Sequence, residues 1–134
     1  QSRAMRSVAG SLRLDLAAYR ELEAFAQLGT ELDPATQAQL DRGQRMVELL
    51  KQGQYKPYAM VDQTISIYAG GKGYLDDIPV GRVQAFEQGL LDFIKARHAD
   101  LRKKLADTGR FTDEIEAQLK VAISQFKAQF TAVG

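Results

Sequence analysis

The chain has 134 residues, which suits a single domain, and its 18 Lys and Arg against 17 Asp and Glu leave a formal net charge of +1. This balance argues against a nucleic-acid binder, because such proteins usually carry a basic excess on one face. The lack of cysteine excludes a disulfide framework and thiol-rich zinc sites. No apolar run approaches the roughly 20 residues of a membrane span. Because the sequence begins at Gln1 without an initiator Met, we expect it to be a piece of a longer protein.

The first predicted helix covers residues 11–28. Its apolar residues recur at helical spacing and form a broad face: Leu14, Ala18, Leu22 and Phe25, widened by Leu12, Leu16, Tyr19 and Ala26. A face this wide indicates a helix that is covered on more than one side. Gly29 is its expected end.

The pair Asp33 and Pro34 predicts the start of a second helix. An aspartate caps the first turn, and a proline at the first helical position loses no hydrogen bond. The residues expected to point inward are Leu40, Val47 and Leu50, and Gly53 is the expected end of the helix.

Residues 59–70 fit two patterns. Helical spacing is present at Val61, Ile65 and Tyr68, and strand-like alternation at Ile65, Ile67 and Ala69. A helix is favoured, because no other segment offers a strand partner.

Three further helices are expected in the second half of the chain. Pro79 opens one of them, a shorter helix covers about 99–106, and Thr112 opens the last, with acidic residues in its first turn. The expected core residues of the first and last of these are Val83, Phe86, Leu90, Ile94, Ile115, Leu119, Ile123, Phe126 and Phe130. The sequence therefore predicts an all-α fold, an irregular bundle of five to seven helices.

Candidate chemistry is sparse. "AGGKG" (69–73) lacks the Ser or Thr that a phosphate-binding P-loop places after its lysine, so a turn is favoured. The single histidine, His98, is expected at the surface near a helix end. Asp76 and Asp77 are adjacent, so their side chains should diverge, which argues against a two-carboxylate acid–base site. The basic residues of 97–104 predict a solvated helix face, with an anionic partner surface as the alternative. We expect no catalytic residue and no metal site.

"MVELLKQGQYKPY" (46–58) places two glutamines around a glycine at the expected end of the second helix. In one interpretation Gln52 and Gln54 belong to a solvent-exposed helix stop. In the other, the glycine lets the chain turn so that both amides reach one planar group with donors and acceptors on its edge. The residues alone leave both interpretations open.

A family resemblance favours the second. "RAMRSVAGSLRLDLAAYRELEAFAQLGTELDPATQAQLDRGQRMVELLKQGQYKP" (3–57) resembles the α subunits of F-type ATP synthases. The similarity continues through "IYAGGKGYLDDIP" (67–79), "FEQGLLDFI" (86–94) and "FKAQF" (126–130), almost the whole chain. It implies that residues 1–134 form the C-terminal helical domain of such a subunit. The nucleotide-binding core, its P-loop and an arginine that reaches the neighbouring catalytic site would lie upstream of Gln1.

The resemblance also implies roles for particular residues. Gln52 and Gln54 match positions that contact adenine in the non-catalytic nucleotide site. The loop "GTELDP" (29–34), with Glu31 and Asp33, matches the place of an acidic loop that in the sister β subunit faces the rotating γ shaft. Helix capping remains an alternative role for these two acids.

The implied function is that of the regulatory, non-catalytic subunit of a proton-translocating ATP synthase, an H⁺-transporting two-sector ATPase. The implied partners are β subunits in an alternating ring and the γ rotor, with δ and ε as further candidates, and neither nucleic acid nor direct membrane insertion. ATP or ADP with Mg would belong to the whole subunit, while the isolated fragment should bind no nucleotide and be inactive. The expected location is the cytoplasmic side of a bacterial plasma membrane, with an organellar membrane as the alternative. The alternative is a stand-alone helical adaptor that binds a partner helix.

Overall fold

The computed structural model describes residues 2–29, 31–55 and 58–133, and for Gln54 and Tyr55 it describes the backbone alone. The described residues form six α-helices and one 3₁₀-helix, with no strand among them. They are α1 (Arg3–Gln27), α2 (Pro34–Tyr55), α3 (Met60–Gly71), η1 (Val80–Arg82), α4 (Val83–Arg97), α5 (Ala99–Thr108) and α6 (Asp113–Val133). The predicted all-α bundle is confirmed, and residues 59–70 are helical as favoured.

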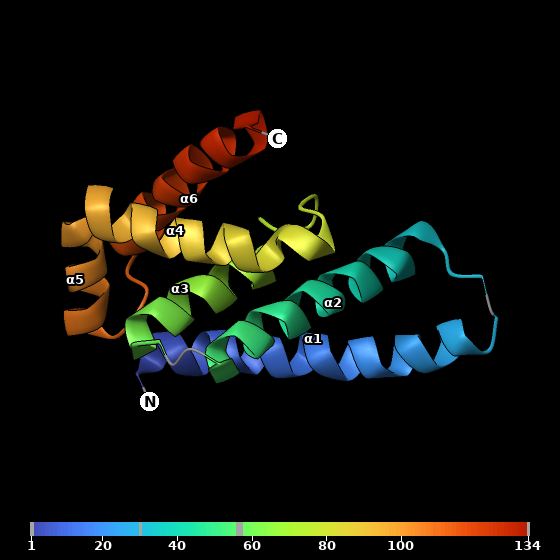
Figure 1. Ribbon diagram of the computed structural model, residues 1–134. Helices are drawn as coiled ribbons and strands as arrows, with labels where there is room; N and C mark the ends of the chain where they lie inside the picture. Colours follow the sequence, from blue (N-terminus) through green and yellow to red (C-terminus); the bar gives the residue numbers. More distant parts are fainter. Residues whose placement is uncertain (1, 30, 56–57, 134) are drawn as a thin grey trace.

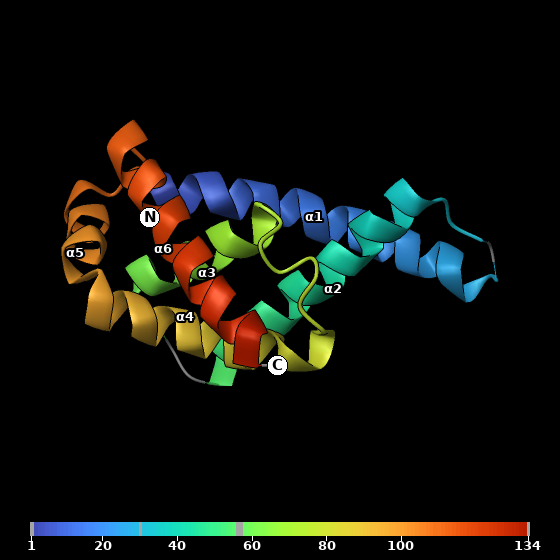
Figure 2. The ribbon, with the colours of Figure 1, turned by 90° about the horizontal axis from the view of Figure 1, so that it is seen from above.

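The helices form an irregular bundle around α3. Helices α1 and α2 are antiparallel and form a long hairpin whose tip extends beyond the other helices (Figure 1). Both α1 and α2 pack on α3, and α4 packs on α2, α3, α5 and α6. Seen from above, α6 crosses the bundle on the side where α5 ends, and the N-terminus lies close by (Figure 2). A backbone hydrogen bond of 2.8 Å from Ala4 N to Gly109 O joins the start of α1 to the end of α5.

One continuous apolar core joins all six helices. The large side chains that are almost fully buried come from α2, α3, α4, α6 and the connection between α3 and η1: Met46, Ile65, Leu75, Ile78, Phe86, Leu90, Leu91, Ile94, Leu119 and Ile123. The rings of Phe126 and Phe130 meet Phe86 edge-on at centroid distances of 5.2 and 5.1 Å. The core positions expected for α4 and α6 are confirmed, with Phe126 and Phe130 half-buried at its edge.

Local capping signals set two of the predicted helix starts. Asp33 Oδ1 accepts the N–H of Thr36 at 2.7 Å, and Thr112 Oγ1 accepts the N–H of Ile115 at 3.1 Å. Helix α1 begins eight residues earlier than predicted, because Ser2 Oγ caps it through the N–H of Met5 at 3.0 Å. These additional turns contain buried apolar side chains, including Met5.

Three sequence expectations about the hairpin are wrong. Leu14 is 74% exposed, and Leu12 takes the buried position on α1 instead. Leu50 is 37% exposed, because the inward face of α2 is formed by Met46 and Leu49. Gly53 does not end α2, which continues to Tyr55.

The connection between α3 and η1 is held from two sides. Arg42 of α2 forms two hydrogen bonds with the carboxylate of Asp76, at 2.6 and 3.2 Å. Lys127 of α6 donates to Asp77 Oδ1 at 2.6 Å, and this bond lowers the pKa of Asp77. The two adjacent aspartates therefore diverge, as predicted. The glycines of "AGGKG" form the end of α3 and its turn, where Gly73 has a positive φ of 89°.

Gly43 lets α1 and α2 approach closely, and its replacement by alanine should destabilise the fold. A Cβ at this position would overlap Cβ and the ring of Tyr19. An alanine inside a helix is ordinarily favoured over glycine by roughly 0.5–1 kcal/mol. Here we expect Gly43→Ala to lower the free energy of unfolding by about 2 kcal/mol, the usual cost of overpacking.

Urea unfolding followed by circular dichroism measures this effect. Gly10→Ala on α1 is the matched control, because a Cβ there meets nothing within 4 Å and should leave the protein equally or more stable. Equal stabilisation by both substitutions would contradict the close contact.

Candidate functional site

Gln52 and Gln54 lie in the last turn of α2. The side chain of Gln52 is half-buried, whereas that of Gln54 lies outside the described residues. Gly53 between them is helical, so the glycine does not supply the turn on which a shared planar ligand was expected to depend. Positions two apart in an α-helix do not share a face. Contact of both amides with one ring therefore requires a change in this last turn.

Gln52 is held by a hydrogen-bonded chain that leads to α4. Its amide forms a hydrogen bond with the Tyr58 hydroxyl, which lowers the pKa of Tyr58 but less than burial raises it. Tyr58 donates in turn to Gln88 Oε1 at 3.4 Å, and Gln88 Nε2 donates to Asp92 Oδ1 at 3.0 Å. The end of α2 is thus tied to α4, and the Gln52 amide is oriented by a protein partner.

A pocket of about 260 Å³ lies beside Gly53, between α1, α2, α3 and α4. Most of its wall is apolar, with Leu12, Met46, Leu49 and Ile67 among the lining residues. Its polar lining residues are Tyr58, Gln63, Ser66 and Glu87, of which Ser66 and Glu87 are buried. The pocket thus combines apolar walls with a buried carboxyl group, that of Glu87.

Glu87 is an unusual component of this wall, because its side chain is 3% exposed. Burial raises the pKa of Glu87 to about 7, and the nearby Ser66 hydroxyl opposes that shift without cancelling it. Ser66 Oγ and Glu87 Oε1 have no hydrogen-bond partner among the described residues. A buried carboxyl oxygen without a donor is costly to keep ionised, which explains the direction of the shift.

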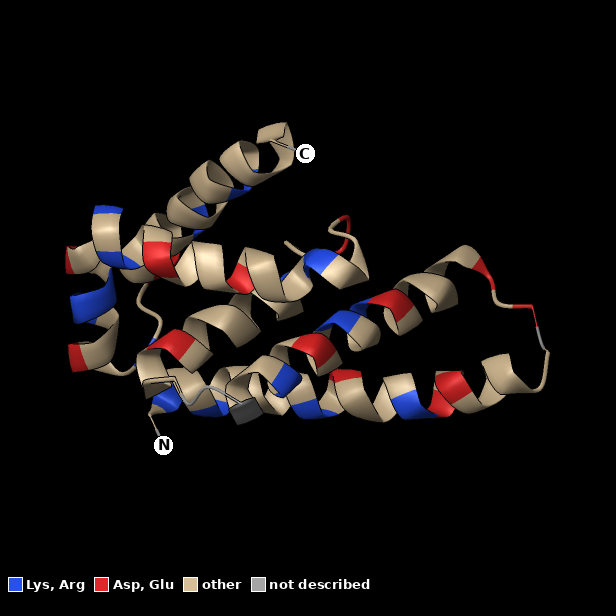
Figure 3. Ribbon diagram, viewed as in Figure 1, with Lys and Arg blue, Asp and Glu red and all other residues tan. Residues whose placement is uncertain are grey.

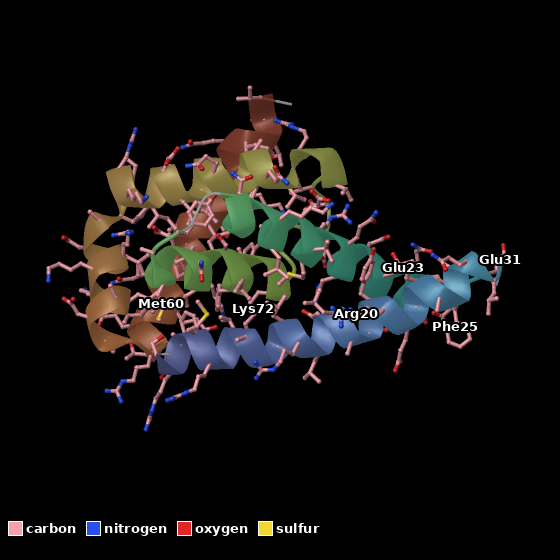
Figure 4. The ribbon with its side chains drawn as sticks, turned by 60° about the horizontal axis from the view of Figure 1, so that its bottom comes forward. Arg20, Glu23, Phe25, Glu31, Met60 and Lys72 are labelled. Carbon is pink, nitrogen blue, oxygen red and sulfur yellow. The ribbon has the colours of Figure 1, made fainter. Side chains whose placement is uncertain are left out.

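The loop between α1 and α2 carries Glu31 and Asp33 at the tip of the hairpin. Acidic segments mark this tip (Figure 3), and Glu31 lies at its far end (Figure 4). Asp33 caps α2, and its hydrogen bonds with Thr36 lower its pKa. The capping role is therefore confirmed for Asp33, while Glu31 is exposed.

Apolar side chains are exposed along the same hairpin. Leu14, Phe25 and Leu28 of α1 are 74%, 53% and 79% exposed. The end of α1 beyond Glu23 is exposed at every position through Gly29, and Phe25 points away from the bundle (Figure 4). The broad apolar face predicted for this helix is covered over its first half and left open over its second.

A hollow of about 650 Å³ lies between the end of α4, α5 and α6 and includes His98. His98 ends α4, as expected, and its Nε2 lies 2.9 Å from Gln125 Oε1. No cluster of three or more metal-ligating side chains occurs in the described part of the chain.

The basic cluster on α5 differs from the predicted solvated face. Arg102 forms a two-pronged ion pair with Asp62 of α3, with distances of 2.9 and 3.0 Å, and Asp62 is buried at 3% exposure. Lys103 and Lys104 pair with Asp107 and Glu114 near the surface. Arg102 therefore joins two helices, and Lys103 and Lys104 are surface ion-pair partners.

The match to known proteins decides the family. The family described as ATP synthase alpha/beta chain, C terminal domain, matches residues 1–126. The chain belongs to this family.

Relatives at about half identity cover nearly the whole chain. ATP synthase subunit alpha of Syntrophomonas wolfei is 53% identical over 130 residues, which are 97% of this chain and 26% of that protein. ATP synthase subunit alpha of Acidothermus cellulolyticus is 51% identical over 130 residues, 97% of this chain and 24% of that protein. The resemblance to α subunits is thus confirmed, and the chain spans about a quarter of the length of these relatives. No helix among the described residues is long and apolar enough to cross a membrane.

The sequence analysis missed two buried carboxyl groups. Glu87 lies on the helical face of Val83, Leu90, Leu91 and Ile94, at spacings of four, three, four and seven residues. Asp62 shares a face with Ile65 and Ala69 in the same way. Helical periodicity applied to acidic residues, as well as to apolar ones, would have found both.

Proposed function

We propose that this chain is the C-terminal helical domain of the α subunit of a bacterial F-type ATP synthase, and that it closes the adenine end of the non-catalytic nucleotide site. The observation that carries the proposal is the match to ATP synthase alpha subunits along 97% of the chain. In the whole subunit the phosphates and Mg would be held by a nucleotide-binding core that precedes residue 1. The domain itself would contribute no reacting group.

Gln52 and Gln54 are the proposed contacts to adenine. Adenine offers ring nitrogens as acceptors and an amino group as donor, and a glutamine amide matches either kind of group. Gln52 is the better supported of the two, because its side chain is described and interacts with the Tyr58 hydroxyl at the end of α2. Contact of both amides with one ring would require the last turn of α2 to open when nucleotide binds.

The long α1–α2 hairpin is the proposed contact to neighbouring subunits. Its exposed apolar side chains, Leu14, Phe25 and Leu28, would pack against adjacent β subunits in an alternating ring. Its tip, with Glu31 and Asp33, would face the γ rotor, and δ and ε are further candidate partners. The assembled enzyme would be a proton-translocating ATP synthase, peripheral on the cytoplasmic side of the plasma membrane.

The adenine contact is tested with α subunits that contain this domain, assembled into complexes. Gln52→Ala removes one net hydrogen bond, worth on the order of 1 kcal/mol, so we expect roughly 5- to 10-fold weaker nucleotide retention at the non-catalytic sites. Gln54→Ala should act in the same direction. Initial ATP hydrolysis should persist, because neither residue contacts a reacting phosphate. Nucleotide that remains bound after gel filtration is the quantity to measure.

Gln44→Ala provides the matched control, since Gln44 lies on the exposed side of the same helix. If both the Gln52 and Gln54 variants retained as much nucleotide as wild type, these residues would only form the end of a helix, and the adaptor function would be favoured.

A further inference from the structure

We propose that the pocket between α1, α2, α3 and α4 is a binding site for a small amphiphilic amine, with its apolar body against Leu12, Met46 and Ile67 and its ammonium group on Glu87 and Ser66. This site borders the proposed adenine contacts, because Gly53 and Tyr58 also line it, but its polar end at Glu87 and Ser66 involves neither glutamine. It rests on residues of this chain alone and does not depend on the proposed function.

The shape and lining of the pocket define the size and polarity of the ligand. A volume of about 260 Å³ is smaller than the roughly 300–1,000 Å³ of sites for drug-sized ligands, so the occupant must be small. Leu12, Met46, Leu49 and Ile67 provide walls for an apolar body. The half-exposed residues Leu50 and Tyr58 also line it and connect the pocket to the surface.

The polar end of the pocket defines the ligand's functional group. Apart from the contact by which the Ser66 hydroxyl lowers the pKa of Glu87, neither Glu87 Oε1 nor Ser66 Oγ has a hydrogen-bond partner among the described residues, and both residues are more than nine-tenths buried. An ammonium group carries three N–H donors and one positive charge, so it can donate to both oxygens and neutralise the carboxylate. A neutral alcohol or an anion would leave the charge of Glu87 uncompensated.

The surrounding charged groups are engaged elsewhere, which leaves Glu87 as the charged group of the pocket. Tyr58 is the other titratable residue in the lining, and burial raises its pKa further from neutrality. Charged side chains on the helices packed against α4 are paired with other residues. On α2 and α3, Glu48 pairs with Lys51 and Gln84, and Asp62 pairs with Arg102 and Lys95. On α5 and α6, Lys104 pairs with Glu114, and Lys127 pairs with Asp77.

The test uses 2-phenylethylammonium as the probe and the 134-residue chain as the protein, in nuclear magnetic resonance titrations at pH 8 and pH 6. With the pKa of Glu87 at about 7, the carboxylate is mostly ionised at pH 8 and mostly protonated at pH 6. We therefore expect binding to be about 10-fold weaker at pH 6, in proportion to the ionised fraction. The uncharged analogue 2-phenylethanol should bind more weakly than the amine at pH 8 and should show no such pH dependence.

Glu87→Gln should abolish the pH dependence and weaken binding of the amine at pH 8 by about 10-fold or more, whereas Glu21→Gln, an exposed acid on α1, should change neither. A second readout does not depend on a variant: saturating amine should lower the pKa of Glu87, followed by the ¹³C shift of its carboxyl carbon. No saturable binding, or binding that leaves this pKa unchanged, would overturn the proposal.

Discussion

Replacement of Arg102 with methionine should lower the free energy of unfolding by about 3 kcal/mol. Asp62 is buried, with a side chain 4% exposed, and Arg102 satisfies both of its oxygens at 2.9 and 3.0 Å. Removal of one partner from a buried ion pair costs roughly 3–5 kcal/mol, because the remaining charge is left without compensation. The lower end applies here, since Arg102 is 29% exposed and Lys95 remains 3.6 Å from Asp62.

Lys103→Met is the matched control for this measurement. Lys103 is the next residue on α5, and it pairs with Asp107 at 2.7 Å with both side chains well exposed. An exposed pair contributes little, because water and salt screen it. The stability difference between the two variants, from urea unfolding, isolates the effect of the buried carboxylate. If the two variants were equally stable, the ion pair between Arg102 and Asp62 would contribute no more to stability than an exposed ion pair does.

The contribution of Glu87 to the stability of the protein should fall as pH rises from about 4.5 to about 7. Burial raises the pKa of Glu87 from 4.5 to about 7 in the folded chain. Between these values the unfolded chain has released the proton and the folded chain retains it, so a rise in pH favours unfolding. A shift of this size corresponds to about 3 kcal/mol of stability, present at low pH and lost by the time pH passes 7.

Subtraction of a Glu87→Gln curve isolates this contribution from the other carboxyl groups. The amide mimics the protonated acid. The free energy of unfolding of the variant, relative to that of wild type, should therefore rise by about 3 kcal/mol between pH 4.5 and 8. Glu21→Gln, on the exposed face of α1, should follow the wild-type curve. Parallel curves for wild type and Glu87→Gln would show that the carboxyl group is ionised in the folded protein as easily as in the unfolded one.

The parts of the fold that local chemistry determines could be predicted from the sequence. Asp33 and Thr112 act through hydrogen bonds to residues three positions away, so the helix starts they mark were visible in the sequence. The core faces of α4 and α6 follow one clear helical period. Prediction of α1 was less accurate, because a broad apolar face does not reveal which side meets a neighbour, and Leu14 proved exposed while Leu12 is buried.

The features of the site depend on tertiary contacts and were less accessible. Arg102 and Asp62 are 40 residues apart, so their pairing could not be derived from α5 alone. Gly53 was expected to end α2, yet a helix tolerates an isolated glycine at a modest cost, and α2 continues to Tyr55. The chain from Gln52 through Tyr58 to Gln88 likewise exists only once α2 and α4 are placed side by side.

The proposed recognition of adenine by Gln52 is tested most directly by the ratio of ATP to GTP retained at the non-catalytic sites. Adenine presents an amino donor where guanine presents a carbonyl acceptor, so an amide held in one orientation by Tyr58 distinguishes them. We predict that Gln52→Ala lowers retained ATP by roughly 5- to 10-fold and GTP much less, and that Tyr58→Phe, which frees the amide to rotate, lowers the ratio as well. An equal loss of ATP and GTP in the Gln52 variant, or an unchanged ratio in both variants, would contradict adenine recognition at this position.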